Sequence, residues 1–336
     1  MQLSYAQRLE DYHLACAFAD CETGFYIDVG GGHPVADNVS YWYYLRGWRG
    51  VVVEPQRELL DLYAYLRPRD IAVGSLVGRK DGEADFYAVE RLHGLSTTLP
   101  DNARTAVELG GTVTTVKMPM TTLATLVAAH AIEQVDFLKV DVEGAEADVL
   151  AGADWSRFRP KIILVEAVAP GSMAQSWADW EPTLLTNGYR FALEDGLNRF
   201  YVAQDAPEIA ARLPSEPVDW NSTAHLYDFG RAPERRDHPN HDLACALVRG
   251  LMAELPRLDP EVLLRALMRG SRTSGDDASG LAERLLFGSA DFPGPALQPD
   301  TSSDRAALYR RLMASDRFRA ALGRIASAYD GGHIME

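Results

Sequence analysis

The sequence predicts an α/β fold in which a Rossmann-like sheet carries an inserted β-hairpin and is followed by a small, mainly α-helical appendage. Three observations support this prediction. Apolar runs of strand length alternate with amphipathic, helix-length segments over the first 205 residues. A glycine-rich turn follows the first apolar run, as in nucleotide-binding folds. Beyond residue 240, apolar residues recur at helical spacing.

A glycine-rich turn follows the first predicted strand. Residues 24–34, GFYIDVGGGHP, contain that strand and then Gly30, Gly31 and Gly32, which let the backbone turn sharply and approach a ligand. The proline that follows suits the first turn of a helix. A strand, a glycine turn and a helix N-terminus together form a nucleotide-type pocket.

The residues around this turn indicate which nucleotide binds. The Gly-x-Gly-x-x-Gly pattern of dinucleotide sites is incomplete, because Val35 occupies the third glycine position. Asp28 would repel a pyrophosphate but suits the ammonium of a methionine moiety. Glu54 ends the next strand, about 20 residues later, where such folds place the acceptor for ribose hydroxyls. This pattern favours S-adenosylmethionine; a non-binding α/β protein with a tight turn is the alternative.

The other elements of the sheet domain follow from periodicity and from turn residues. Residues 194–197 form a short turn between two strands with no helix between them, so the sheet should end on a β-hairpin, as in methyltransferases rather than dehydrogenases. We expect helices at 4–19, 38–46, 56–66, 122–131, 145–150 and 177–187, and strands at 51–54, 70–75, 135–141, 159–168, 189–193 and 198–203.

An insertion interrupts this alternation. Residues 82–89 and 112–118 alternate polar and apolar side chains and therefore read as strands of a half-exposed sheet. Between them lies the loop HGLSTT, which begins at His93. At this point in a doubly wound fold the loop would lie beside the ligand crevice, where loops tend to carry function. A surface hairpin without a role is the alternative.

A second motif, VDFLKVDVEGAE, spans residues 135–146. Lys139 and Asp141 point to one face of its strand, because side chains alternate with a period of two. Glu143 belongs to the following turn, and Glu166 lies near the end of the next apolar strand. We expect Asp141 and Glu143 at the mouth of the same crevice as Asp28 and Glu54. A salt-bridged lysine and a helix-capping glutamate are the alternatives.

Composition limits the classes of partner and compartment. The 336 residues are 47% hydrophobic and 24% charged, enough to bury a sizeable core. The net charge of −15 argues against nucleic acid, whose binding depends on neutralising phosphates. Cys16, Cys21 and Cys245 lack metal-binding spacing, which fits a reducing compartment. Since neither a signal sequence nor a membrane-spanning run is recognisable, we expect a cytoplasmic protein without a transmembrane segment.

The predicted domain organisation has three parts. We expect the sheet domain at 1–205 and a linker at 206–240, which is rich in proline, aspartate and arginine. A helical C-terminal domain should occupy 241–336, with helices at 241–254, 259–269, 278–287 and 304–329. The histidines there are scattered, so no metal site is inferred.

Several motifs, in this order and spacing, carry a family resemblance: SYAQ, GFYIDVGGGHP, RGWRGVVVEP, LSTT, VDFLKVDVEGAE and RPKIILVE. Over residues 4–205 the chain resembles the FkbM family of S-adenosylmethionine-dependent methyltransferases. The DVEG strand end with its preceding lysine is the most specific part. The resemblance implies a class I methyltransferase sheet and O-methylation of a sugar hydroxyl in a polysaccharide, glycolipid or glycosylated natural product.

The resemblance also implies residue roles. A sugar hydroxyl is a poor nucleophile at neutral pH, so a base or a metal ion should assist it. No metal ligand is assigned, although a divalent cation could bind if two of the acids converge. The expected cofactor-binding residues are Asp28, Gly30, Gly31, Gly32, Glu54, Pro55, Ser75 and Asp141. The candidate catalytic residues are Asp141, Glu143, Lys139 and Glu166, followed by His33 and His93.

Two other functions fit part of the pattern. A non-catalytic cofactor-binding scaffold of a glycan-assembly complex would bind S-adenosylmethionine without turnover, and its helical tail would recruit partners or form a homo-oligomer. A nicotinamide-dependent oxidoreductase is disfavoured by the missing third glycine and by the terminal hairpin. The expected partner of the enzyme is a carbohydrate or glycoconjugate acceptor.

Overall fold

The chain forms two compact units, Met1–Asp228 and Phe229–Glu336, in the computed structural model. The structure describes residues 3–90, 93–172 and 174–259, together with residues 262, 263, 265–267, 310, 314 and 318.

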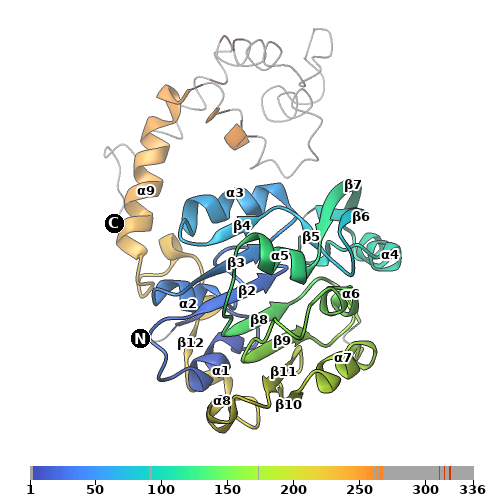
Figure 1. Ribbon diagram of the computed structural model, residues 1–336. Helices are drawn as coiled ribbons and strands as arrows, with labels where there is room; N and C mark the ends of the chain where they lie inside the picture. The colour runs from blue at the N-terminus through green and yellow to red at the C-terminus, as the bar shows by residue number, and fades with distance from the viewer. Residues whose placement is uncertain are drawn as a thin grey trace. The chain divides into compact units, whose positions relative to one another are not determined.

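A seven-stranded sheet organises the first unit (Figure 1). Six strands run in one direction, and only β11 (Asn198–Ala203) runs antiparallel, to both of its neighbours, β9 (Ile162–Glu166) and β10 (Tyr189–Glu194). The central strands are almost wholly buried, as expected for a parallel sheet covered on both faces. The sheet therefore ends on the predicted hairpin. Its order is β10 (Tyr189–Glu194), β11 (Asn198–Ala203), β9 (Ile162–Glu166), β8 (Phe137–Val140), β2 (Phe25–Val29), β3 (Arg49–Val53) and β4 (Ile71–Val73).

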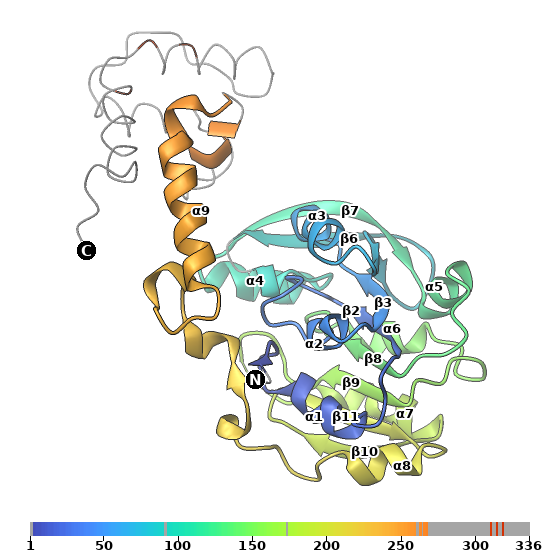
Figure 2. The ribbon, with the colours of Figure 1, turned by 90° about the vertical axis from the view of Figure 1, so that its left-hand side faces the viewer.

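Helices surround these strands in both views (Figures 1 and 2). Three of them start several residues later than the sequence predicts, and in one case, that of the helix expected at 177–187, a 3₁₀ turn (Trp177–Asp179) occupies the first residues. Leu9 adopts a left-handed backbone, so the first helix starts only after it. Asn38 accepts a hydrogen bond from the backbone N–H of Tyr41, which starts the second helix there. The helices are α1 (Glu10–Ala17), α2 (Tyr41–Leu45), α3 (Arg57–Leu66), α5 (Leu123–Ala129), α6 (Glu146–Ala151) and α7 (Glu181–Thr186).

The aromatic residues of the α2 region contribute to the core. The ring of Tyr43 lies 4.6 Å from that of Trp48 and 5.0 Å from that of Phe137, measured between centroids. All three side chains are buried. Such ring pairs stabilise a core beyond their buried area. The cluster anchors α2 against the sheet near the start of β8.

The insertion forms a separate three-stranded sheet. Strand β7 (Thr112–Thr121) pairs antiparallel with β6 (Gly82–Glu90) and parallel with β5 (Leu76–Val77). The two long strands are those the sequence predicts. A 3₁₀ turn (His93–Leu95) and helix α4 (Pro100–Glu108) lie between them, and the sequence did not predict this helix. Pro100 suits a helix start, and the buried Ala103 and Ala106 fix the inner face.

The first unit continues past the boundary near Asp205 that the sequence indicates. Helix α8 (Pro207–Arg212) lies where an irregular linker is expected and contacts α1. Strand β1 (Leu3–Ser4) pairs with β12 (Ala224–His225), and the His225 ring lies 2.5 Å from the carbonyl oxygen of Ala6. Two-residue strands have no periodicity, so the sequence gives no sign of this pairing.

The second unit contains helix α9 (His241–Glu254), at the predicted place. The His241 ring lies 2.8 Å from the carbonyl oxygen of Ala232. The predicted helix at 278–287 lies outside the described residues, as do residues 260, 261, 264, 268 and 269 of the helix predicted at 259–269 and most residues of the one predicted at 304–329. Among the helices described, none is both long and apolar enough to cross a membrane.

Candidate functional site

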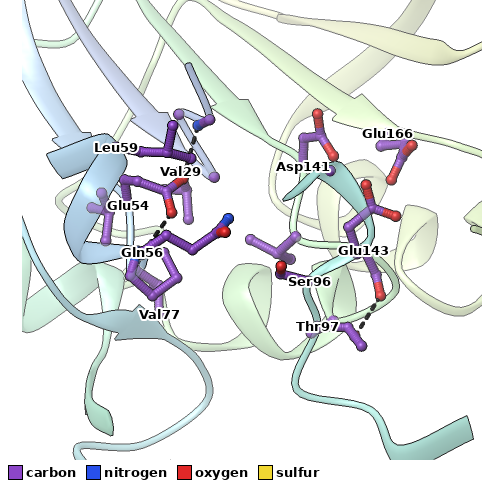
Figure 3. Close-up of a pocket in the computed structure, with 18 of the residues that line it drawn as sticks. Val29, Glu54, Gln56, Leu59, Val77, Ser96, Thr97, Asp141, Glu143 and Glu166 are labelled. Carbon is purple, nitrogen blue, oxygen red and sulfur yellow. Dashed lines mark hydrogen bonds between the residues drawn. The ribbon is translucent and has the colours of Figure 1, made fainter. Parts of the chain in front are cut away.

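A cavity of about 360 Å³ opens at the carboxyl ends of β2, β3, β8 and β9 (Figure 3). Ligands of open α/β sheets bind in this position. The glycine-rich turn, the end of β3, the inserted loop and the DVEG turn all contribute to its wall. The predicted site residues that line it are Gly30, Gly31, Gly32, His33, Glu54, Pro55, Ser75, Lys139, Asp141, Glu143 and Glu166.

Two predicted site residues are absent from this lining. Asp28 is only 1% exposed, and its carboxylate accepts a hydrogen bond of 2.6 Å from Ser40. It therefore lies beneath the cavity rather than in contact with a ligand there. His93 begins the 3₁₀ turn of the inserted loop, and neighbours of it, Gly94, Ser96 and Thr97, line the cavity.

The backbone of the glycine-rich turn approaches the end of β8. Gly30 has a φ of 75°, and a Cβ there would lie 1.7 Å from the carbonyl oxygen of Asp141. Gly32 also has a positive φ, 57°, but a Cβ there would meet nothing within 4 Å. Position 30 thus requires glycine because of close backbone contact, whereas position 32 requires it only because of backbone conformation.

A buried network beneath the turn was not predicted. The guanidinium of Arg67 donates to Asn38 and to Ser40, each over 2.9 Å, and pairs with Asp70 at 2.7 Å. Asn38 in turn donates to the carbonyl of Gly31 over 2.9 Å. The arginine therefore stabilises the turn from below. An Arg-x-x-Asp spacing at a helix end is visible in the sequence, but nothing in it reveals that the pair is buried.

Glu54 lies on one side of the cavity, beside Gln56 and Leu59 (Figure 3). Its carboxylate accepts hydrogen bonds from the backbone N–H groups of Gly32, at 2.9 Å, and Gln56, at 2.7 Å. The side chain is 3% exposed, and burial raises its pKa to about 7. Since both bonds come from the backbone, the carboxylate is fixed in place whether or not a ligand is bound.

Lys139 connects the two motifs. Its ammonium donates to the carbonyl of Gly30 over 2.6 Å and lies 3.2 Å from Asp141 and 3.5 Å from Asp28. Burial alone would lower its pKa, but the neighbouring carboxylates of Asp141 and Asp28 raise it above the ordinary value. The ammonium stays charged, so it cannot be a base. Its contacts are those of a residue that positions the turn and Asp141.

Three carboxylates converge on the side opposite Glu54. Those of Asp141, Glu143 and Glu166 each place one oxygen within 4.8 Å of the others, and they point toward one another in Figure 3. Burial, with the charge of Asp141 next, raises the pKa of Glu143 to about 9 and that of Glu166 to about 11. From the sequence, a divalent cation could bind only if two of these acids lie close together, and in the structure all three do.

The inserted segment fixes the position of Glu143. This residue adopts a φ of 57°, and its carbonyl accepts hydrogen bonds from Thr97, at 2.9 Å, and Asn102, at 2.7 Å. Glu146 accepts from the backbone N–H groups of Val142 and Gly144 and so closes the same turn. Neither Thr97 nor Asn102 was predicted as a site residue, although Thr97 belongs to the LSTT motif.

His33 lines the cavity, and its ring can offer a ligand only a hydrogen-bond donor, the Nε2–H group. Its Nδ1 accepts from the backbone N–H groups of Val35, at 3.1 Å, and Ala36, at 3.0 Å. Burial lowers its pKa, which favours the neutral ring. The proton then lies on Nε2, so the ring has no free lone pair for a ligand proton. This arrangement does not support the predicted role of His33 as a base.

Comparison with known proteins identifies a family for the part of the chain that contributes most of the cavity lining. Residues 28–191 match the family model described as the methyltransferase FkbM domain. This range contains the glycine-rich turn, Glu54, the inserted sheet and the three converging carboxylates. Among curated proteins, none matches the chain.

Proposed function

Because residues 28–191 belong to the methyltransferase FkbM family, whose reaction class uses S-adenosylmethionine, we propose that this chain methylates a hydroxyl of a sugar. The acceptor would be part of a glycan, a glycolipid or a glycosylated natural product. The observation that carries the proposal is the division of one cavity into two chemically different sides. Glu54 and the glycine-rich turn form one side, and three carboxylates form the other.

The first side fits a nucleoside with a methionine tail. Glu54 offers an immobilised carboxylate as the acceptor for two ribose hydroxyls. Ser75 lines the same cavity, and its buried Oγ has no hydrogen-bond partner among the described residues, so a ligand can supply one. The cavity volume of about 360 Å³ lies within the range of roughly 300–1,000 Å³ typical of small-molecule sites.

The second side fits a hydroxyl-bearing acceptor. Gln7 and Asp37 line the cavity in addition to the three carboxylates. Amide and carboxylate oxygens accept hydrogen bonds from hydroxyls, so a cavity lined by these groups is better suited to a sugar than to an apolar molecule.

The chemistry required of these residues is alignment and proton removal. S-adenosylmethionine supplies the methyl group on a sulfonium, and a bond from the acceptor oxygen to that carbon forms as the carbon–sulfur bond breaks. Fixing the two reactants in line supplies much of the rate. The hydroxyl proton passes to an ionised carboxylate of the cluster; Glu143, whose pKa burial raises to about 9, accepts it only after losing its own proton.

The test is methyl transfer from labelled S-adenosylmethionine to a panel of nucleotide sugars, glycolipids and oligosaccharides, read by mass spectrometry. We expect one added methyl group, at an oxygen, on at least one acceptor class. Methylation of nitrogen or carbon would contradict the proposal. Cofactor binding with no transfer to any sugar would instead favour the non-catalytic scaffold.

A further inference from the structure

The three carboxylates come from two neighbouring parallel strands. Asp141 and Glu143 follow β8, and Glu166 ends β9. Because adjacent parallel strands end at the same edge of a sheet, their terminal side chains meet, and Glu143 folds back over the turn to join them (Figure 3). The acids are thus brought together by the fold itself.

One of these acids has a buried oxygen without a partner. Glu166 is 8% exposed, and its Oε2 makes no hydrogen bond within the described part of the chain. Its carboxylate faces those of Asp141 and Glu143. A buried, unpaired carboxylate oxygen is costly, so a ligand with positive charge would be bound favourably there.

The positive charge near these acids is insufficient to balance them. In the described residues, Lys139 forms ion pairs with Asp141 and Asp28, whereas neither Glu143 nor Glu166 forms an ion pair. One ammonium therefore faces four carboxylates. Either protons or a cation must neutralise the remainder, because like charges this close and this buried repel strongly.

We propose that Asp141, Glu143 and Glu166 bind one divalent cation, Mg²⁺ or Mn²⁺, at the wall of the cavity opposite Glu54. Carboxylate oxygens are the ligands that these hard cations prefer. The role of the cation rests on the proposed function. In that reaction the cation would bind the acceptor hydroxyl and lower its pKa, so that the hydroxyl loses its proton without a strong base.

The first measurement is binding of Mn²⁺ alone to the full chain, followed by the loss of the free-ion EPR signal, with Mg²⁺ as competitor. We expect one saturable site per chain that Mg²⁺ displaces. Glu166→Gln should weaken Mn²⁺ binding at least tenfold. The exposed Glu133→Gln, which makes the same chemical change away from the site, should leave it unaltered.

Thermal unfolding with and without Mg²⁺ separates loss of the site from loss of the fold. In metal-free buffer Glu166→Gln should unfold at the same temperature as the wild type or higher, since the amide has the shape of a protonated carboxyl and relieves the cluster of one acid that must otherwise hold a proton. Added Mg²⁺ should stabilise the wild type but not the variant. Glu143→Gln provides a second variant with the same expectation.

Absence of saturable Mn²⁺ binding at millimolar concentration, or equal affinity in the wild type and both variants, would overturn the cation site and leave shared protons as the neutralising species. Neither readout depends on methyl transfer. A chain that binds Mn²⁺ as expected but methylates no sugar would keep the site and refute the proposed function. A chain that methylates a sugar without binding Mn²⁺ would refute the cation site and support the proposed function.

Discussion

At the scale of the residue, two glycines of one turn differ in what they tolerate. Gly30→Ala places a Cβ 1.7 Å from the backbone of Asp141, so the ends of β2 and β8 must separate, whereas Gly32→Ala meets no atom within 4 Å. We expect Gly30→Ala to lose at least 3 kcal/mol of unfolding free energy, and Gly32→Ala about 1 kcal/mol from its positive φ. Urea unfolding monitored by fluorescence measures both. Equal losses would contradict the close backbone approach.

The sequence predicts which residues lie at the site better than it predicts what each of them does there. The sequence placed Glu54, Asp141 and Glu143 at one crevice, because strand ends in a parallel sheet meet at one edge, and it left open whether Glu166 joins them. It could not show that Asp28 lies beneath the crevice, since one strand position does not reveal which neighbour covers it. The role of the other candidates, including His33, depends on hydrogen bonds that spacing does not encode.

At the scale of the element, the insertion supports the DVEG turn through two side chains. Replacing Thr97 with Val and Asn102 with Leu removes both hydrogen bonds to the carbonyl of Glu143. We expect the double variant to lose about 1–3 kcal/mol of unfolding free energy. Its affinity for S-adenosylmethionine should change little, because Glu54 lies on the other side of the cavity. Its methyl transfer should fall at least tenfold.

Binding titrations and transfer assays on the same preparation distinguish this expectation from general unfolding. A matched control is Thr105→Val, because the Thr105 hydroxyl donates only to its own helix, to the carbonyl of Asp101. If the double variant transferred methyl groups as fast as this control, the insertion would not position Glu143.

The elements themselves were predicted where periodicity is strong and missed where it is weak. The strands β2, β3, β8 and β9 are mostly apolar runs of strand length, so the sequence pattern predicted their places. Helix α4 carries few apolar residues, and only Ala103 and Ala106 on it are buried. The pairing of β1 with β12 joins segments more than 200 residues apart, and no local pattern could reveal it.

At the scale of the whole molecule, a buried acid links the N-terminal helix to the terminal hairpin. Asn198 donates to Glu10 over 2.7 Å, and burial, with the charge of Asp195 next, raises the pKa of Glu10 to about 8 from an ordinary 4.5. Its proton is retained in the folded state and released on unfolding between these values. The contribution of the protonated Glu10 to the free energy of unfolding is therefore complete below pH 4.5 and is lost as the pH rises through about 8.

We expect the free energy of unfolding to fall from pH 5 to pH 8, with Glu10 contributing up to about 1.4 kcal/mol per pH unit. Glu10→Gln keeps the shape without the titrating proton, so its stability should decline less over the same interval. Urea unfolding at both pH values measures this. A decline identical in the wild type and the variant would show that Glu10 does not titrate in this range.

Isothermal titration with S-adenosylmethionine shows whether the cavity binds this cofactor with Glu54 as the acceptor for its ribose. We expect the wild type and Glu133→Gln to bind the cofactor alike. Glu54→Gln should weaken binding roughly tenfold to a hundredfold, since a hydrogen bond to a charged group contributes about 1.5–3 kcal/mol. A folded wild type that does not bind the cofactor, or an unchanged affinity in Glu54→Gln, would contradict this account.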